Sequence, residues 1–160
     1  MLTVITYIHP NETHLDRCIE GLKQQDTPFT WIVLAHANLT IDIPHKLVLL
    51  PAEISNKAGA YNFILPQINT KYIAYNDADD ISLPNRFEQQ IAFLEEQNSI
   101  DILGGGLQIN EVHKGWDVYE THEDICSFMI INNPIVNSTV MLRNKNNFWG
   151  VKVKYNESYN

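Results

Sequence analysis

Residues 71–80 read KYIAYNDADD, and they give the strongest indication of the fold class. Its first six residues are mainly aromatic and apolar, which is typical of a buried strand. The strand runs directly into Asp77, Asp79 and Asp80, so these acids follow its carboxyl end. In open α/β sheets, ligands bind in the crevice outside the carboxyl ends of the strands. We therefore expect the acidic cluster to lie in such a crevice.

The acidic cluster has the chemistry of a metal site. If the chain stays extended, successive side chains alternate between faces, so Asp77 and Asp79 point to the same side. Mg²⁺ and Mn²⁺ prefer oxygen ligands and keep open positions for substrate phosphates. The alternative is that Asp79 and Asp80 begin a turn before the next helix and satisfy backbone donors there. Short acidic motifs recur by chance, so the motif alone leaves both interpretations open.

Outward from this stretch, short apolar runs alternate with segments of helical period, which favours an α/β sheet built from crossover units. Strands are expected at residues 2–8, 29–35, 46–50, 71–76, 100–103 and 138–143. Helices are expected around residues 15–22, 58–68, 84–97 and 125–131, with Thr13 and Asp16 capping the first and Pro66 kinking the second or ending it early.

The rest of the chain has a weaker pattern. Residues 108–119 fit a hairpin or an excursion from the fold, and residues 144–160 form a polar, Asn-rich tail. We find neither an internal repeat nor a linker. Residues 1–160 are therefore predicted to form a single domain, with a mostly parallel central sheet flanked by helices.

Composition and charge limit the classes of function. The formal net charge of −8 argues against DNA or RNA as a partner, because nucleic-acid binders carry a basic stripe. An acidic domain that handles phosphate must place positive charge locally, and a bound divalent cation does this compactly. No apolar run approaches the ~20 residues of a membrane helix. The first strand lacks the flanks of a signal peptide. We expect a soluble, cytoplasmic protein, free or peripheral to a membrane.

The two cysteines, Cys18 and Cys126, are far apart and belong to no metal-spaced cluster. Cys18 falls on the apolar stripe of the first predicted helix. Because lone cysteines usually behave as small buried hydrophobic residues, we expect both to be reduced and structural.

Three segments resemble the family 2 glycosyltransferases of the GT-A fold. The central block contains AYN at 60–62, KYIAYNDADD at 71–80, PNRFEQQ at 84–90 and FL at 93–94, with a spacing that needs no gaps. The amino-terminal segment is a strand followed by HPNE at 9–12 and a helix ending in QQ at 24–25. The third is NPIVNSTVM at 133–141. The resemblance covers nearly the whole chain, which corresponds to the front two-thirds of a typical family domain.

The resemblance implies transfer of a sugar, with inversion, from a nucleoside-diphosphate donor to a hydroxyl of a carbohydrate, lipid or protein acceptor. The expected donor is a UDP-sugar. The resemblance also implies that Asp77 contacts the donor ribose or the metal, and that Asp79 binds Mn²⁺ or Mg²⁺ bridging the pyrophosphate. His9 is expected near the nucleobase, and Asn62, the matched asparagine of the second helix, is assigned to the donor site.

Two departures from the family pattern move donor contacts to other residues. The acidic residue that ends the family's second strand and recognises the base is missing from residues 34–38, which read LAHAN. His36 or Asn38 is expected to replace it by hydrogen bonding. The family's arginine before the asparagine of the second helix is Tyr61 here, and Lys57 is expected to supply the positive charge instead.

A third departure concerns the catalytic base. The family's Glu-Asp pair, whose Asp is the usual base, would come after residues 154–160, so Glu157 is the nearest candidate in this chain. The alternative is a nucleotide-sugar-binding module or fragment that lacks the base and transfers nothing by itself. A metal-dependent nucleotidyltransferase ranks last, because the Gly-rich, basic phosphate loop expected near its first strand is absent.

Overall fold

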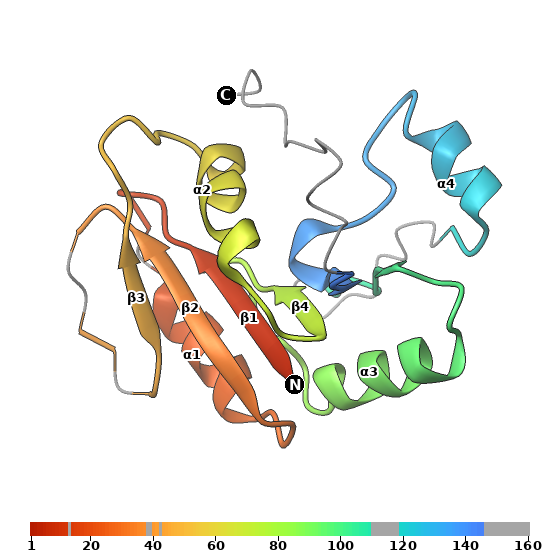
Figure 1. Ribbon diagram of the computed structural model, residues 1–160, viewed down its shortest axis with the longest axis horizontal. Coiled ribbons are helices and arrows are strands. Elements are labelled where there is room, and N and C mark those ends of the chain that lie inside the picture. The colour runs from red at the N-terminus through yellow and green to blue at the C-terminus, as the bar shows by residue number, and fades with distance from the viewer. Residues whose placement is uncertain (13, 38–39, 42, 110–118, 146–160) are drawn as a thin grey trace.

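The computed structural model describes residues 1–12, 14–37, 40–41, 43–109 and 119–145, and Figure 1 shows how its elements are arranged. The helices are α1 (Leu15–Lys23), α2 (Lys57–Ile64), α3 (Arg86–Glu96) and α4 (His122–Phe128), with short 3₁₀ turns at Leu65–Gln67 and Asn137–Thr139. The strands are β1 (Leu2–Tyr7), β2 (Phe29–Ala35), β3 (Lys46–Leu49), β4 (Tyr72–Tyr75), β5 (Ile102–Leu103) and β6 (Met141–Arg143).

The strands form one six-stranded sheet in the order β3-β2-β1-β4-β6-β5. The first four strands in this order are mutually parallel, and β6 pairs antiparallel with both β4 and β5. The predicted α/β class with a mostly parallel sheet is therefore confirmed. Among the described residues, no helix is long and apolar enough to cross a membrane.

The sheet is buried on both faces, which explains the continuous apolar runs in its central strands. One core cluster joins the sheet to α1 and α3 through Cys18, Leu22, Phe87 and Leu94. A second cluster, on the opposite face, joins it to α2. In Figure 1, α1 lies behind the strands. Every residue of β1 is buried, so this strand is fixed by packing from both sides.

The parallel pairing of β1 with β4 brings the loops that follow these two strands together at the carboxyl ends of the sheet. Ile5 is opposite Tyr75 in the parallel ladder, and the backbone N–H of Asn76 donates to the carbonyl of Ile5 at 3.1 Å. The residues that follow β1 therefore lie beside the residues that follow β4. This places His9 at the same end of the sheet as Asp77.

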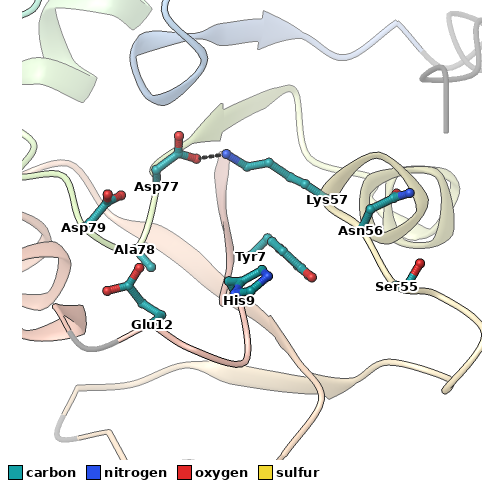
Figure 2. Close-up of a pocket in the computed structure, with 9 residues that line it drawn as sticks. All are labelled: Tyr7, His9, Glu12, Ser55, Asn56, Lys57, Asp77, Ala78 and Asp79. Carbon is teal, nitrogen blue, oxygen red and sulfur yellow. Dashed lines mark hydrogen bonds and ion pairs between the residues drawn. The ribbon is translucent and has the colours of Figure 1, made fainter. Parts of the chain in front are cut away.

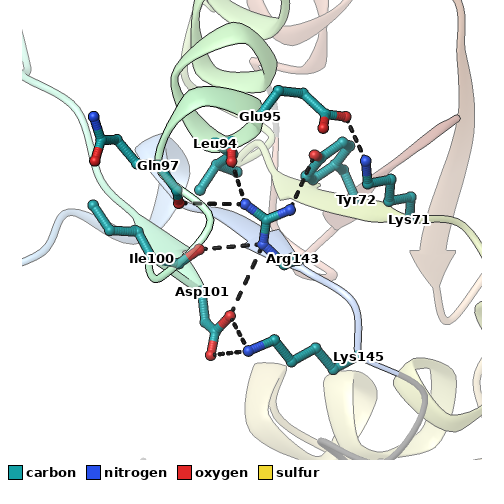
Figure 3. Close-up of polar contacts among 9 residues, drawn as sticks. All are labelled: Lys71, Tyr72, Leu94, Glu95, Gln97, Ile100, Asp101, Arg143 and Lys145. Carbon is teal, nitrogen blue, oxygen red and sulfur yellow. Dashed lines mark hydrogen bonds and ion pairs between the residues drawn. The ribbon is translucent and has the colours of Figure 1, made fainter.

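Arg143, at the end of β6, attaches the antiparallel edge of the sheet to α3 (Figure 3). Its guanidinium donates to the carbonyl of Leu94, in the last turn of α3, and to the carbonyl of Ile100 at 3.3 Å. Nearby, Lys145 lies 2.6 Å from the Asp101 carboxylate. These contacts fix the strand that flanks β4 on the side away from β1.

Several predicted boundaries were wrong for local reasons. The fourth helix covers His122–Phe128 rather than 125–131, because the hydroxyl of Thr121 accepts the backbone N–H of Asp124 at 3.1 Å and caps an earlier start. The last strand begins at Met141 rather than Ser138, since Asn137–Thr139 forms a 3₁₀ turn. The break near Pro66 is confirmed, with α2 ending at Ile64.

Other predictions are settled in part. Helix α1 begins after His14 without a side-chain cap. Thr13 lies outside the described residues, as do residues 110–118 and the tail from 146 to 160.

Both cysteines are free. Cys18 is buried as predicted, whereas Cys126 is exposed, so the expectation that both are buried structural residues was wrong for Cys126. It lies on α4, a helix without buried residues.

Candidate functional site

A cavity of about 560 Å³ opens at the carboxyl ends of β1 and β4, beside the first turn of α2 (Figure 2). Three segments contribute its walls: the end of β1 and the loop after it, the start of α2, and the acidic turn after β4. The lining residues are Tyr7, His9, Glu12, Ser55, Asn56, Lys57, Asp77, Ala78 and Asp79. The expectation that the acidic cluster lies in a crevice at the strand ends is thus confirmed.

The acidic residues form a turn rather than an extended segment. Strand β4 ends at Tyr75, and the backbone N–H of Asp80 donates to the carbonyl of Asp77 at 3.2 Å. The side-chain amide of Asn76 donates to the carbonyls of Asp77 and Asp80, at 3.0 and 3.2 Å. The prediction that simple alternation aligns Asp77 with Asp79 was therefore wrong. Both residues nevertheless line the cavity, because the turn carries them there.

Asp77 makes two side-chain contacts with residues of other segments. Its Oδ1 accepts from Lys57 Nζ at 2.5 Å and from the side-chain amide of Asn137 at 3.0 Å. Lys57 is the first residue of α2, a helix whose Asn56 cap accepts the backbone N–H of Gly59 at 2.8 Å. Cap and helix together set the direction of the lysine. The predicted positive charge of Lys57 is therefore present in the cavity.

Asp79 differs from Asp77 in its surroundings. Its side chain is exposed, and no other residue in the described part of the chain gives it a hydrogen bond or an ion pair. Two acids of one turn thus face the same cavity, one paired and one open. Among the described residues, no group of three or more His, Cys, Asp or Glu side chains could hold a metal ion alone. The pair suits a cation that also takes phosphate oxygens as ligands, since Mg²⁺ is commonly bound by one or two carboxylates plus substrate phosphates.

The remaining acid of the turn, Asp80, is half-buried and is not among the residues that line the cavity. Burial raises the pKa of its carboxyl, while a hydrogen bond from Ser138 acts in the opposite direction. We therefore assign Asp80 a structural role in the turn. The alternative that Asp79 and Asp80 begin a turn is confirmed for the backbone, since residues 77–80 form one.

A buried hydrogen-bond network centred on Arg86 lies beneath the turn. Its guanidinium donates to the carbonyl of Tyr75 at 2.9 Å, to Oγ of Ser82 at 2.8 Å and to Oδ1 of Asn76 at 3.2 Å. Asn76 Oδ1 also accepts from the Ser82 hydroxyl. Because these groups hold the strand end and the turn, Arg86 positions the acidic residues without entering the cavity lining.

Burial makes the charged form of Arg86 less favourable than it is in water. Burial lowers its pKa to about 10, and the nearby charges of Asp80 and Asp77 partly offset this effect. The motif PNRFEQQ contains this arginine, but its sequence position gives no sign of the contacts, which reach residues on β4 and near β6.

The wall formed by the loop after β1 is also polar. His9 Nδ1 accepts the backbone N–H of Asn11 at 3.3 Å, and Glu12 Oε1 accepts the backbone N–H of His14 at 2.6 Å. His9 was predicted as a site residue, and the structure places it in the cavity. Glu12 was not, although it belongs to the same short segment, HPNE.

Not every predicted site residue reaches the cavity. His36 is exposed beyond β2, with its ring at 90° to that of Tyr7 and the ring centroids 6.3 Å apart. Asn62 lies within α2, and neither residue lines the cavity. Asn38 and Glu157 lie outside the described residues. Sequence reasoning also missed Tyr7, Ser55, Asn56 and Asn137, whose proximity depends on contacts between distant segments.

Comparison with known families and proteins identifies relatives. The sequence profile described as Glycosyl transferase family 2 matches residues 3–156. A Haemophilus influenzae protein described as an uncharacterized glycosyltransferase is 27% identical over 99% of this chain and 56% of its own length. The Escherichia coli O-antigen biosynthesis glycosyltransferase WbnJ is 26% identical over 89% of this chain and 61% of its own. The chain thus spans about 56–61% of the length of these relatives.

Solved structures show the same fold. TarS from S. aureus, residues 1–349 in complex with UDP-GlcNAc, has a TM-score of 0.68 at 16% identity, over 89% of this chain and 45% of that one. The Pyrobaculum calidifontis mannosyltransferase PcManGT, in complex with GDP-Man and Mn²⁺, has a TM-score of 0.55 at 16% identity, over 68% and 35% of the two chains. The expected GT-A fold is confirmed by the TarS likeness.

Proposed function

Since the chain belongs to glycosyltransferase family 2, we propose that its cavity binds a nucleotide-sugar, in the first instance a UDP-sugar, through a divalent cation. The domain is then the donor-binding part of an inverting transferase that acts on an acceptor hydroxyl. One observation carries the proposal: Asp77, Asp79 and Lys57 line the same cavity. Two carboxylates and one ammonium in one cavity suit a pyrophosphate with its metal ion.

Asp79 and Asp77 are the residues that would hold Mn²⁺ or Mg²⁺. Asp79 is open to the cavity, and Asp77 offers Oδ2 in addition to the oxygen bonded by Lys57. A cation bound there supplies Lewis-acid stabilisation of the negative charge that grows on the leaving diphosphate. Two structural relatives were solved in complex with such ligands, TarS with UDP-GlcNAc and PcManGT with GDP-Man and Mn²⁺, and this supports the class of ligand.

Lys57 gives the cavity a second way to neutralise phosphate. Its side chain is 37% exposed, so the ammonium has freedom to turn from Asp77 toward a phosphate oxygen. An ammonium carries three donors on a flexible stem, which suits this exchange. We propose that Lys57 bonds Asp77 in the empty cavity and the donor phosphate in the filled one.

The other wall accommodates the nucleoside. His9 projects into the cavity from the loop after β1, opposite the start of α2 (Figure 2). An imidazole ring there offers a flat surface and a ring nitrogen to the base. The acceptor and the catalytic base stay predictions: Glu157, the candidate base, lies outside the described residues.

The first experiment is a titration of UDP, GDP and UDP-sugars into the protein, with and without Mn²⁺, followed by calorimetry and by thermal stability. We expect binding that requires Mn²⁺ and disappears in Asp79→Asn. The matched control is Asp26→Asn, an exposed acid outside the cavity lining, with the same change in charge. The absence of binding by every nucleotide, with and without metal, would contradict the proposal.

Transfer and hydrolysis assays with the bound sugar nucleotide then separate two outcomes. Turnover with inversion of the anomeric centre supports the transferase. Binding without turnover supports the alternative, a nucleotide-sugar-binding module that lacks its base.

A further inference from the structure

The Tyr7 hydroxyl is a buried polar group without a partner. Tyr7 ends β1 and is only 7% exposed, and its Oη makes no hydrogen bond within the described part of the chain. Buried polar groups in native proteins are almost always bonded, because an unsatisfied donor loses its hydration without compensation. Tyr7 is also a lining residue of the cavity. The oxygen itself is covered, so a ligand in that cavity supplies the missing partner once the atoms that cover the hydroxyl move aside.

The ring of Tyr7 is held in place. Its backbone pairs with Leu34 in the parallel ladder of β1 and β2, and its side chain packs in the core cluster on the α2 face of the sheet. The ring of His36, which follows β2, makes a T-shaped contact with it. A hydroxyl on a fixed ring is preorganised, so little side-chain entropy is lost when it bonds a ligand.

The cavity has a charged end and an uncharged end. In Figure 2, the Tyr7 hydroxyl points toward Ser55 and Asn56 and away from Asp77 and Asp79. The acidic turn and Lys57 suit phosphates and a cation, whereas the Tyr7 end offers neutral hydrogen-bonding groups. A ligand that fills both ends therefore has an anionic part and a neutral polar part.

A phenol hydroxyl can both donate and accept one hydrogen bond in the plane of a base edge. Burial raises the pKa of Tyr7, so the hydroxyl keeps its proton at neutral pH and can donate. Nucleobases present a ring N–H next to a carbonyl oxygen, which matches a group of this kind. The carboxylate that the family uses at the end of β2 is absent here, where the residue is His36.

We propose that the Tyr7 hydroxyl hydrogen-bonds the nucleobase of the bound nucleoside diphosphate, and so takes over base recognition from the missing acid. The inference rests on the proposed function, because the phosphates must lie at the acidic turn for the base to reach Tyr7. It differs from the expectation that His36 or Asn38 contacts the base. In this arrangement His36 supports Tyr7 through its ring.

The test is Tyr7→Phe, which keeps the ring and removes only the hydroxyl. Affinity for whichever of UDP and GDP binds the unchanged protein with Mn²⁺ should fall by about five- to tenfold, the effect of one lost hydrogen bond. Affinity for inorganic pyrophosphate with Mn²⁺, which has no base, should not change. The thermal stability of the free variant should be equal to or higher than that of the unchanged protein, since an unsatisfied group has been removed.

The control is Tyr72→Phe, which removes a hydroxyl that accepts from Arg143 at 3.4 Å outside the cavity lining. It should leave nucleotide affinity unchanged. Equal nucleotide affinity in Tyr7→Phe and the unchanged protein overturns the inference, and so does an equal loss for pyrophosphate and nucleotide. If the unchanged protein binds no nucleotide at all, the proposed function itself fails. This outcome is distinct from equal nucleotide affinity in Tyr7→Phe and the unchanged protein, which overturns only the role of Tyr7.

Discussion

Lys57 Nζ lies 2.5 Å from Asp77 Oδ1, so an ammonium group occupies one of the two carboxylates that we propose as metal ligands. The pair is partly exposed, with 37% and 22% of the two side chains accessible. Ion pairs of this exposure contribute little to stability, so they can open at small cost. If the site binds metal as proposed, the ammonium and the divalent cation compete for Asp77, and a bound phosphate relieves the competition by accepting the ammonium.

This competition predicts opposite effects of Lys57→Met on two ligands. Mn²⁺ alone should bind about two- to fivefold more tightly, because a partly exposed ion pair no longer occupies Asp77. Nucleoside diphosphate with Mn²⁺ should bind about tenfold more weakly, since a charge-assisted hydrogen bond to phosphate is lost. Electron paramagnetic resonance of free Mn²⁺ measures the first, and calorimetry the second.

Lys71→Met is the matched control. Lys71 forms an ion pair of the same length, 2.5 Å to Glu95, but on the surface and outside the cavity lining. It should change neither affinity. Weaker binding of Mn²⁺ alone by Lys57→Met would show that the lysine does not compete with the metal for Asp77.

A second prediction concerns Gly21, where α1 meets the segment after the acidic turn. A Cβ atom at Gly21 would lie 2.5 Å from the backbone N and 2.9 Å from the carbonyl of Ser82. Gly21→Ala should therefore lower the free energy of unfolding by about 1–3 kcal/mol through overpacking. An ordinary Gly→Ala change inside a helix has the opposite sign, with a gain of about 1 kcal/mol.

Urea denaturation measures the change, and Gly106→Ala is its control. A Cβ atom at Gly106 meets nothing within 4 Å, so that variant should stay within about 0.5 kcal/mol of the unchanged protein. Because Ser82 also bonds Asn76, Gly21→Ala should weaken metal-dependent nucleotide binding as well. A stable Gly21→Ala variant would mean that α1 can move away from Ser82 without loss.

The sequence was sufficient to predict the elements that depend on local pattern. The buried strands at 29–35 and 71–76 and the helix after Pro84 follow from apolar runs and helical period, which packing on both faces of the sheet enforces. Asp77, Asp79, His9 and Lys57 were predicted to share a site, and they line one cavity. These residues lie at the ends of elements, where chain order restricts their position.

The rest depends on contacts that sequence spacing does not encode. Asn137 reaches Asp77 across 60 residues of sequence, and Arg86 reaches the carbonyl of Val140 across 54. Period-two alternation gave the wrong geometry for the acids, because the strand ends at Tyr75 and a turn follows. His36, to which a base contact was assigned, does not line the cavity, and its ring lies at 90° to that of the lining residue Tyr7 with the centroids 6.3 Å apart.

The third prediction tests Arg86 as the residue that positions the turn. Arg86→Met removes the guanidinium that donates to the Tyr75 carbonyl, to Ser82 Oγ and to Asn76 Oδ1, although Asn76 keeps the hydrogen bond from the Ser82 hydroxyl. The free energy of unfolding should fall by about 3 kcal/mol, because three hydrogen bonds from a charged, largely buried group are lost together. Chemical denaturation measures this loss. Arg17→Met, at an exposed position on α1, should change stability by less than about 0.5 kcal/mol.

Arg86→Lys separates charge from geometry. Lysine keeps the positive charge but cannot donate along several directions from one planar group. We expect it to recover only part of the lost stability. Full recovery of stability and of metal-dependent nucleotide binding would show that charge alone is required beneath the turn.

The last prediction concerns Cys18, which lies under Asn76 in the core. Burial raises the pKa of its thiol from 9.0 to about 11, while hydrogen bonds from Thr6 and Asn76 act in the opposite direction. Above pH 9.0 the unfolded chain releases this proton and the folded chain keeps it. The folded state then binds more protons than the unfolded state. The contribution of the Cys18 thiol to the free energy of unfolding is therefore fully present below that pH and is lost as the pH rises toward 11. The loss attributable to Cys18 should be about 2–3 kcal/mol.

Thermal denaturation at pH values from 8 to 11 in Cys18→Ala isolates this contribution, because the variant has no thiol to titrate there. We expect its stability to decline less steeply with pH than that of the unchanged protein, although it starts lower from the loss of core packing. Cys126→Ala, at an exposed position, should keep the full decline. Since Asn76 bonds both the Cys18 sulfur and the carbonyls of the acidic turn, ionisation of Cys18 should also loosen that turn. Parallel declines in the two cysteine variants would place the alkaline transition elsewhere in the protein.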